Sequence, residues 1–103
     1  MMRTREDLQY KLEELLGSKN VYFQPVTNTQ LKYPCIVYSL NTFNDKYADN
    51  KRYAKYSSYS VTHIYQKYSS RLQEAFMDGF DYIHFDGPAR IDGLYHDTYT
   101  IHI

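Results

Sequence analysis

The residues best suited to bind a metal or to transfer a proton near neutral pH are four histidines. They are His63, His84, His96 and His102. All four fall on predicted strands, and the even spacing of the last two places them on one strand face. None lies two or four residues from another, whereas zinc motifs need ligands that converge with a recognisable spacing. The pattern favours sheet histidines, and we predict no metal site and no cofactor.

A catalytic nucleophile would have to be Cys35, or a serine, beside a histidine in a pocket that lowers its pKa. Cys35 lies in the most apolar segment of the chain, where a buried thiol behaves as a small hydrophobic side chain. Five aspartates flank predicted turns and strand ends, where this residue type bonds local backbone groups. They are Asp78, Asp81, Asp86, Asp92 and Asp97. Because phosphate loops, dinucleotide fingerprints and nucleophile elbows are also absent from the sequence, we do not expect an enzyme.

Charge is distributed unevenly along the chain. Residues 1–68 hold ten basic and six acidic groups, a net charge of +4, and residues 69–103 hold two and six, a net charge of −4. The neutral total argues against a protein that binds nucleic acid by bulk phosphate neutralisation. Head-to-tail contacts between copies would use the asymmetry, although solvated faces would also account for it.

The length of 103 residues predicts one domain, 1–103, and a composition with 43% hydrophobic and 23% charged residues is typical of a globular fold. A lone cysteine and no N-terminal apolar run favour a reducing cytoplasm. Every apolar stretch is far shorter than the roughly 20 residues that span a bilayer. The 13 tyrosines suit half-buried strands and protein interfaces.

Residues 4–16 have the pattern of an amphipathic helix. Thr4 is placed to cap the amide of Asp7, and Gly17 is placed to end the helix. Its apolar stripe consists of Leu8, Leu12, Leu15 and Leu16.

Residues 70–77 predict a second, shorter helix. Ser70 and Gln73 match a capping box, and Gly79 follows the end of the segment. An apolar stripe again indicates one buried face.

Five further segments read as strands. They are residues 20–24, 35–42, 52–66, 80–85 and 94–103. We expect the first to lie near a sheet edge and the second to be central. The polar residues 43–51 are interpreted as an exposed connection, and 86–88 and 92–93 as turns.

Residues 52–66 alternate over a length well beyond the mean strand of about 5–6 residues. We therefore predict that residues 52–56 pair with the preceding strand as a projecting hairpin arm. The order α-β-β-β-α-β-β indicates the α+β class, an antiparallel sheet of about five strands with two helices on one face.

Residues 46–56 interleave four basic residues with three tyrosines on this predicted arm. Such interleaving can hold single-stranded nucleic acid, with Tyr59 and Tyr65 as a stacking platform on the sheet. Tyrosine and arginine are equally enriched at protein interfaces, which agrees better with zero net charge. We prefer protein contact, and a small tyrosine-rich nucleic-acid-binding module is the alternative.

Strand and turn motifs from residue 20 onward resemble those of small tail-terminator or neck proteins of long-tailed bacteriophages. The matching segments are residues 20–25 (NVYFQP), 31–38 (LKYPCIVY), 48–51 (ADNK) and 59–62 (YSVT). The C-terminal residues 94–100 (LYHDTYT) are similar to the final strand of that family. The connection at residues 66–70 (QKYSS) departs from the acidic, proline-containing connection of the pattern, so an adjacent neck or minor capsid connector protein is a second reading.

The resemblance implies a structural virion protein, assembled in the bacterial cytoplasm, that forms a homo-oligomeric ring of six subunits on the finished tail tube. Its partners would be the tail tube protein and a head-completion or connector protein, with DNA passing through the ring and no membrane involved. A neutral subunit suits a channel in which DNA must slide. The residues predicted to make ring or tube contacts are Tyr47, Asp49, Lys51, Arg52 and Tyr53.

Overall fold

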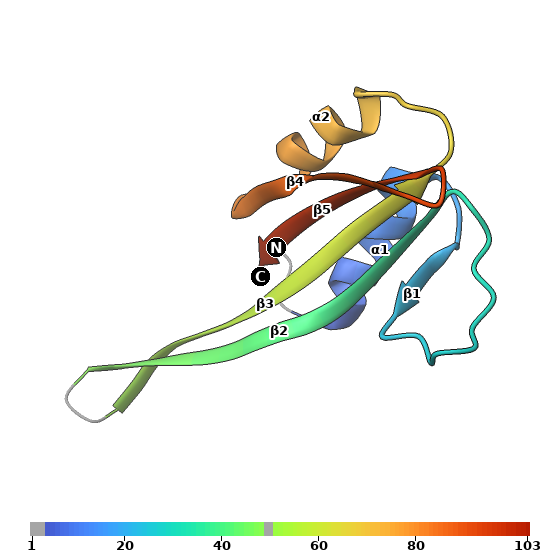
Figure 1. Ribbon diagram of the computed structural model, residues 1–103. Helices are drawn as coiled ribbons and strands as arrows, with labels where there is room; N and C mark the ends of the chain where they lie inside the picture. Colours follow the sequence, from blue (N-terminus) through green and yellow to red (C-terminus); the bar gives the residue numbers. More distant parts are fainter. Residues whose placement is uncertain (1–3, 49–50) are drawn as a thin grey trace.

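The computed structural model describes residues 4–48 and 51–103, and within these ranges the side chains outside residues 42–56. The described chain forms two helices and five strands (Figure 1). In chain order they are α1 (Arg5–Leu16), β1 (Val21–Phe23), β2 (Cys35–Ala48), β3 (Lys51–Tyr65), α2 (Arg71–Gly79), β4 (Ile83–Ile91) and β5 (Leu94–His102). This order and the α+β class match the prediction from sequence.

The five strands form one sheet in the order β1-β2-β3-β5-β4. Neighbouring strands run antiparallel except β1 and β2, which pair in parallel. The prediction of an antiparallel sheet is therefore wrong for one strand pair, and the sheet is mixed. The connection between β1 and β2 brings the chain back to the end of the sheet where β1 starts, so the two strands run in the same direction. β1 lies at an edge as predicted, whereas the central strand is β3 and not β2.

Local signals fix the ends of α1. The Thr4 hydroxyl accepts a hydrogen bond from the Asp7 amide at 3.1 Å, and the Thr4 amide donates to the Asp7 carboxylate at 3.3 Å. This reciprocal capping box satisfies backbone donors that the first helical turn leaves free. Gly17 ends the helix with φ of 78°, a left-handed conformation that glycine adopts without strain.

The predicted capping box of α2 is wrong. Ser70 has helical φ and ψ angles, and its side chain caps no backbone amide in the described structure. Gln73 donates instead to the buried carboxylate of Asp97 at 2.9 Å. Gly79 is the last residue of α2 and lies against Lys11 and Leu15 of α1.

The interpretation of residues 43–51 as an exposed connection is also wrong. β2 continues to Ala48 and β3 begins at Lys51, with backbone pairs along the whole arm, including the predicted pairing of residues 52–56. A ladder satisfies its own backbone groups without needing an apolar pattern, so composition did not reveal it.

The segment predicted as strand 80–85 followed by a turn at 86–88 is one strand, β4, with a bulge. The register shifts between Phe85 and Gly87, and Gly87 has φ of 131°. Pro88 is tolerated because β4 is an edge strand. The predicted turn at Asp92 and Gly93 is confirmed, with φ of 53° and 77° joining β4 to β5.

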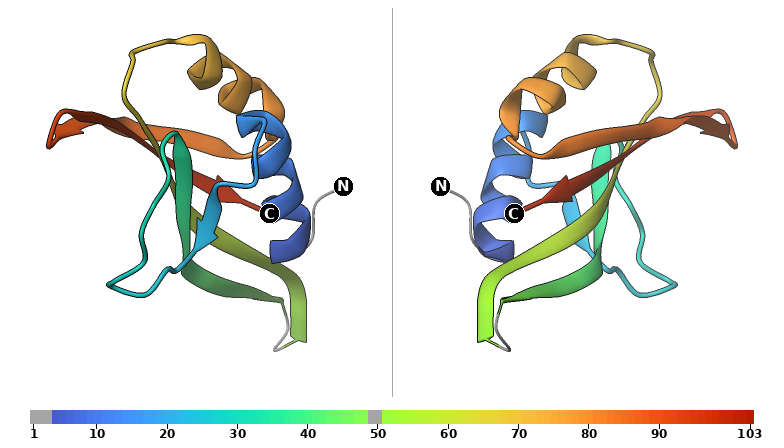
Figure 2. Two further views of the ribbon diagram at one scale, coloured as in Figure 1. Left: turned by 90° about the vertical axis from the view of Figure 1, so that its right-hand side faces the viewer. Right: turned by 90° about the vertical axis from the view of Figure 1, so that its left-hand side faces the viewer.

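Both helices cover the same face of the sheet (Figures 1 and 2). Leu8 and Leu12 from α1 and Phe76 from α2 belong to one buried cluster with the sheet. The strand residues of this cluster are Val21, Ile36, Tyr38, Tyr59, Val61, Tyr99 and Ile101. The ring of Phe76 stacks on Tyr99 with centroids 4.5 Å apart, so α2 docks mainly through this side chain.

Replacing Phe76 with alanine is expected to lower the free energy of unfolding by about 3–5 kcal/mol, because it opens a cavity in the core. The matched change at the next residue, Met77→Ala, should cost less than about 1 kcal/mol, since Met77 is 43% exposed. Chemical denaturation measures both. Equal losses would contradict docking of α2 through Phe76.

Candidate functional site

The β2–β3 hairpin extends beyond the rest of the sheet. β5 pairs with β3 as far as Ser58, and Ile103 exchanges two backbone hydrogen bonds with Ser57, at 3.2 and 3.0 Å. Beyond this point the two described strands pair only with each other, from Asn44–Tyr56 to Ala48–Lys51. We call residues 44–48 and 51–56 the projecting hairpin; at about 3.3 Å per residue it adds about 20 Å to the body.

Four of the five predicted contact residues lie together on the backbone of this hairpin, toward its outer end. Tyr47 pairs with Arg52, Lys51 precedes Arg52, and a register shift leaves Tyr53 as an extra residue on β3. Asp49 lies outside the described residues. A bulge of this kind bends a strand and increases its twist.

A two-stranded ribbon by itself is at best marginally stable in water. The projecting hairpin has no third strand beside it in the described structure, and it points away from the body of the molecule (Figure 1). The molecule is 51 Å long along its longest axis. It is therefore the part of the fold with most to gain from burial against another molecule.

Both edge strands of the sheet, β1 and β4, are poorly suited to pair with a strand from another molecule. β1 has three residues, which offer few backbone groups for pairing. β4 carries Pro88, which lacks an amide donor, and a bulge beside Gly87. Contacts between copies would have to use the projecting hairpin and side-chain surfaces.

The predicted stacking platform is wrong. Tyr59 and Tyr65 are 6% and 5% exposed, because both lie on the face that the helices cover. Tyr59 packs on Tyr38, with ring centroids 6.0 Å apart. Neither ring is accessible to a base.

The opposite, open face of the sheet carries short hydroxyl side chains and histidines. The hydroxyls of Thr62 and Thr98 lie 3.3 Å apart. Thr100 donates to Asp86 at 2.6 Å, and Nδ1 of exposed His84 lies 2.8 Å from the same carboxylate. These two hydrogen bonds hold the pKa of Asp86 below its usual value.

The other three histidines lie on different faces of the sheet, according to their positions along the strands. His96 and His102 are half-buried on the open face, on one strand face as predicted, and His63 is buried under the helices. Within residues 4–48 and 51–103, no three His, Cys, Asp or Glu side chains gather as they would to hold a metal.

A buried polar cluster joins α2 to the sheet. The side chain of Asp97 is 1% exposed. Its carboxylate accepts hydrogen bonds from the hydroxyl of Tyr65 at 2.7 Å and from the side-chain amide of Gln73 at 2.9 Å. The ring of His63 stacks on Tyr65 with centroids 4.4 Å apart, and its Nδ1 has no hydrogen-bond partner among the described residues. Burial, followed by the bond to Asp97, raises the pKa of Tyr65.

Cys35 is buried, as its apolar segment indicated. Burial raises the pKa of the thiol to about 11. The sulfur is therefore protonated at neutral pH, whereas a nucleophilic cysteine requires a lowered pKa.

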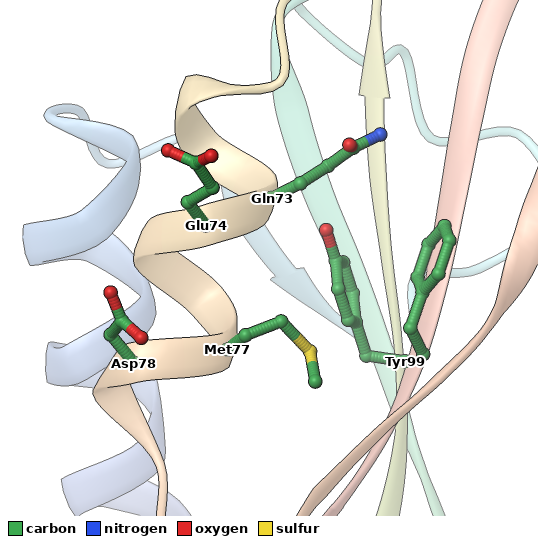
Figure 3. A pocket seen from close by; sticks show the side chains of 6 residues that line it. Gln73, Glu74, Met77, Asp78 and Tyr99 are labelled. Carbon is green, nitrogen blue, oxygen red and sulfur yellow. The ribbon is translucent and has the colours of Figure 1, made fainter.

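An open pocket of about 520 Å³ lies between α2 and strands β4 and β5 (Figure 3). Its lining residues are Gln73, Glu74, Met77 and Asp78 from α2, Phe85 from β4 and Tyr99 from β5. Sequence reasoning missed this pocket. Its lining comes from three elements that only the fold brings together, so no local pattern in the sequence indicated it.

No protein-family model and no curated protein matches this chain. In the part of the chain that the structure describes, no helix has the length and apolar character needed to cross a membrane.

Acid should destabilise the protein through His63. Burial lowers its pKa from 6.5 to about 4, although Asp97 opposes this shift, so the unfolded chain binds the proton more readily than the folded one. Neutral His63 makes its full contribution to the free energy of unfolding above pH 6.5. This contribution, roughly 3 kcal/mol, is lost as the pH falls toward 4.

Urea denaturation between pH 4 and 7 measures this loss. The variant His63→Phe should show a flatter pH profile, whereas His84→Phe, which changes an exposed histidine, should keep the steep one. A steep profile in His63→Phe would contradict the assignment to His63.

Proposed function

We propose that this chain is a structural protein of a bacteriophage neck, which caps the tail tube as a homo-oligomeric ring and takes part in joining the tail to the head. The single observation that carries the proposal is the projecting hairpin, a two-stranded ribbon that contact with another molecule would stabilise. The segments that resemble tail-terminator and neck proteins include residues of the strands that anchor this hairpin, 31–38 and 59–62.

The proposed mechanism is capping by shape, without a catalysed reaction. One face of the ring docks on the last ring of tail tube protein, and the other face lacks the surface that would add a further tube ring. Head-to-tail contacts that close on themselves fix the number of subunits at six, and the missing docking surface on the outer face stops growth of the tube. The outer face then receives a head-completion or connector protein.

The charge distribution supports this arrangement in two ways. A basic N-terminal part and an acidic C-terminal part are complementary between neighbouring copies. The neutral total suits a ring through which DNA slides during ejection, because strong phosphate binding would retain the DNA.

Electron microscopy of tails assembled with and without the protein tests the function. Overlong tails in its absence are the expected result, because nothing then stops tube polymerisation. Tails of normal length that fail to bind heads would assign the protein to an adjacent connector instead. Tails of normal length that bind heads would contradict the proposal.

The double substitution Arg52→Ala and Tyr53→Ala should prevent ring formation, since both residues lie on the projecting hairpin. Light scattering should then report the subunit mass of 12.3 kDa in place of six times that mass.

A matched control removes one tyrosine and one basic residue from exposed positions at α1 and the loop after it, Tyr10→Ala and Lys19→Ala. This control should still form rings and join tails. Rings in the hairpin variant would show that another surface builds the contact.

A further inference from the structure

A group of cations and tyrosines lies where the connection between β3 and α2 meets the paired ends of β4 and β5. This end of the sheet is opposite the projecting hairpin (Figure 1). The rings of Tyr68 from the connection and Tyr95 from β5 have centroids 5.7 Å apart. The guanidinium of Arg90, on β4, lies 5.0 Å from the centroid of the Tyr95 ring. Two further cations flank Tyr68 along the chain, and we call the five residues the basic patch: Lys67, Tyr68, Arg71, Arg90 and Tyr95.

The aromatic ring that carries Arg90 is anchored in the core. Tyr95 stacks on Tyr65 with centroids 5.4 Å apart and an angle of only 22° between the rings. The Tyr65 hydroxyl in turn donates to the buried carboxylate of Asp97 at 2.7 Å. An exposed guanidinium that rests on a fixed ring loses less conformational freedom on binding, and its planar set of donors stays available to an anion. The stack therefore holds Arg90 ready for a ligand at the surface.

The positive charge of the basic patch is not balanced within the molecule. Lys67, Arg71 and Arg90 are exposed, and none of them forms an ion pair with a side chain that the structure describes. The carboxylates nearest to them along the chain, Glu74 and Asp92, are exposed as well and do not pair with them. An anion from another molecule would therefore meet three cations whose charge no described partner neutralises.

The chemistry of this surface favours phosphate over a protein partner. The connection consists of five exposed polar residues, Gln66, Lys67, Tyr68, Ser69 and Ser70. Arginine, lysine, tyrosine and serine side chains are the usual ligands of DNA phosphates. The core of a protein interface is instead apolar and depleted of charge, whereas neither the connection nor the basic patch contains an aliphatic residue.

We infer that the basic patch contacts the backbone phosphates of double-stranded DNA. The inference rests on the proposed function for the source of this DNA, which passes through the ring, and it places the patch on the channel. Because a few phosphate contacts bind weakly, the patch guides the DNA without retaining it. The neutral total charge of the chain is compatible with this role, since three of its cations gather on one surface.

The salt dependence of DNA binding tests the contact in the full-length protein. Fluorescence anisotropy of a short labelled duplex gives the slope of log K against log salt concentration, which is about −0.9 for each neutralised phosphate. The unchanged protein should bind with a slope of about −2.7 or steeper, as for three phosphates. Arg71→Gln/Arg90→Gln should make the slope shallower by about 1.8 and weaken binding at least about tenfold at low salt.

A matched control and a second variant accompany this measurement. Lys19→Gln/Lys32→Gln removes two exposed cations outside the basic patch, changes the net charge equally, and should keep both slope and affinity. Lys67→Gln, which removes one cation from the connection alone, should make the slope shallower by about 0.9. Circular dichroism confirms that each variant folds, and sedimentation velocity reports its self-association.

The outcomes separate this inference from the proposed function. If the unchanged protein does not bind the duplex, or if the patch variant and the control change the slope equally, the inference is overturned and the proposed function stands. Loss of self-association in the patch variant with unchanged DNA binding would assign the patch to contacts between copies, and would overturn the inference too. Tails of normal length that bind heads without the protein would overturn the proposed function, whereas a shallower slope in the patch variant would still support the phosphate contact.

Discussion

The backbone ladder between β2 and β3 is the interaction on which the rest of the molecule depends. Its register sets Tyr38 opposite Val61, which in turn lies opposite Tyr99, so that all three face the helices. A slip of one residue would turn these side chains to the open face. The same ladder continues past the last contact with β5 and becomes the projecting hairpin, with register shifts between Leu40 and Thr42 and between Lys46 and Tyr47.

A second constraint acts between α2 and the sheet. The carboxylate of Asp97 binds Gln73 on α2 and Tyr65 on β3, and this places the helix over Phe85 and Tyr99. Asp97 and Tyr65 are buried and Gln73 is half-buried, so leaving the Asp97 carboxylate without these partners would be costly. Together with the stacking of Phe76 on Tyr99, this cluster holds α2 against the sheet.

Where local chemistry decides the structure, the sequence was sufficient. The capping pair of Thr4 and Asp7, the stop at Gly17 and the turn at Asp92 and Gly93 depend on residues within a few positions, and all were predicted. The alternating strands and the α+β class also followed, because a period of two reports burial on one face.

Where distant parts of the chain compete, the sequence was insufficient. Gln73 does not form the predicted capping box with Ser70, because Asp97, 24 residues away, offers its side chain a buried acceptor. The parallel pairing of β1 depends on the path of a loop, which composition does not encode. Tyr59 looked available for stacking because alternation separates the two faces of a strand without telling which one the helices cover.

The extra residue at Tyr53 has a geometric consequence for any closed assembly. A bulge fixes the direction in which the outer part of a ribbon points, and in a cyclic array this direction sets the angle between successive subunits. Removing the bulge would straighten the arm and would also remove the side chain of Tyr53. A closed ring built through this arm would then have a different number of subunits, or would become an open spiral, so the single extra residue would set the angle between neighbouring subunits.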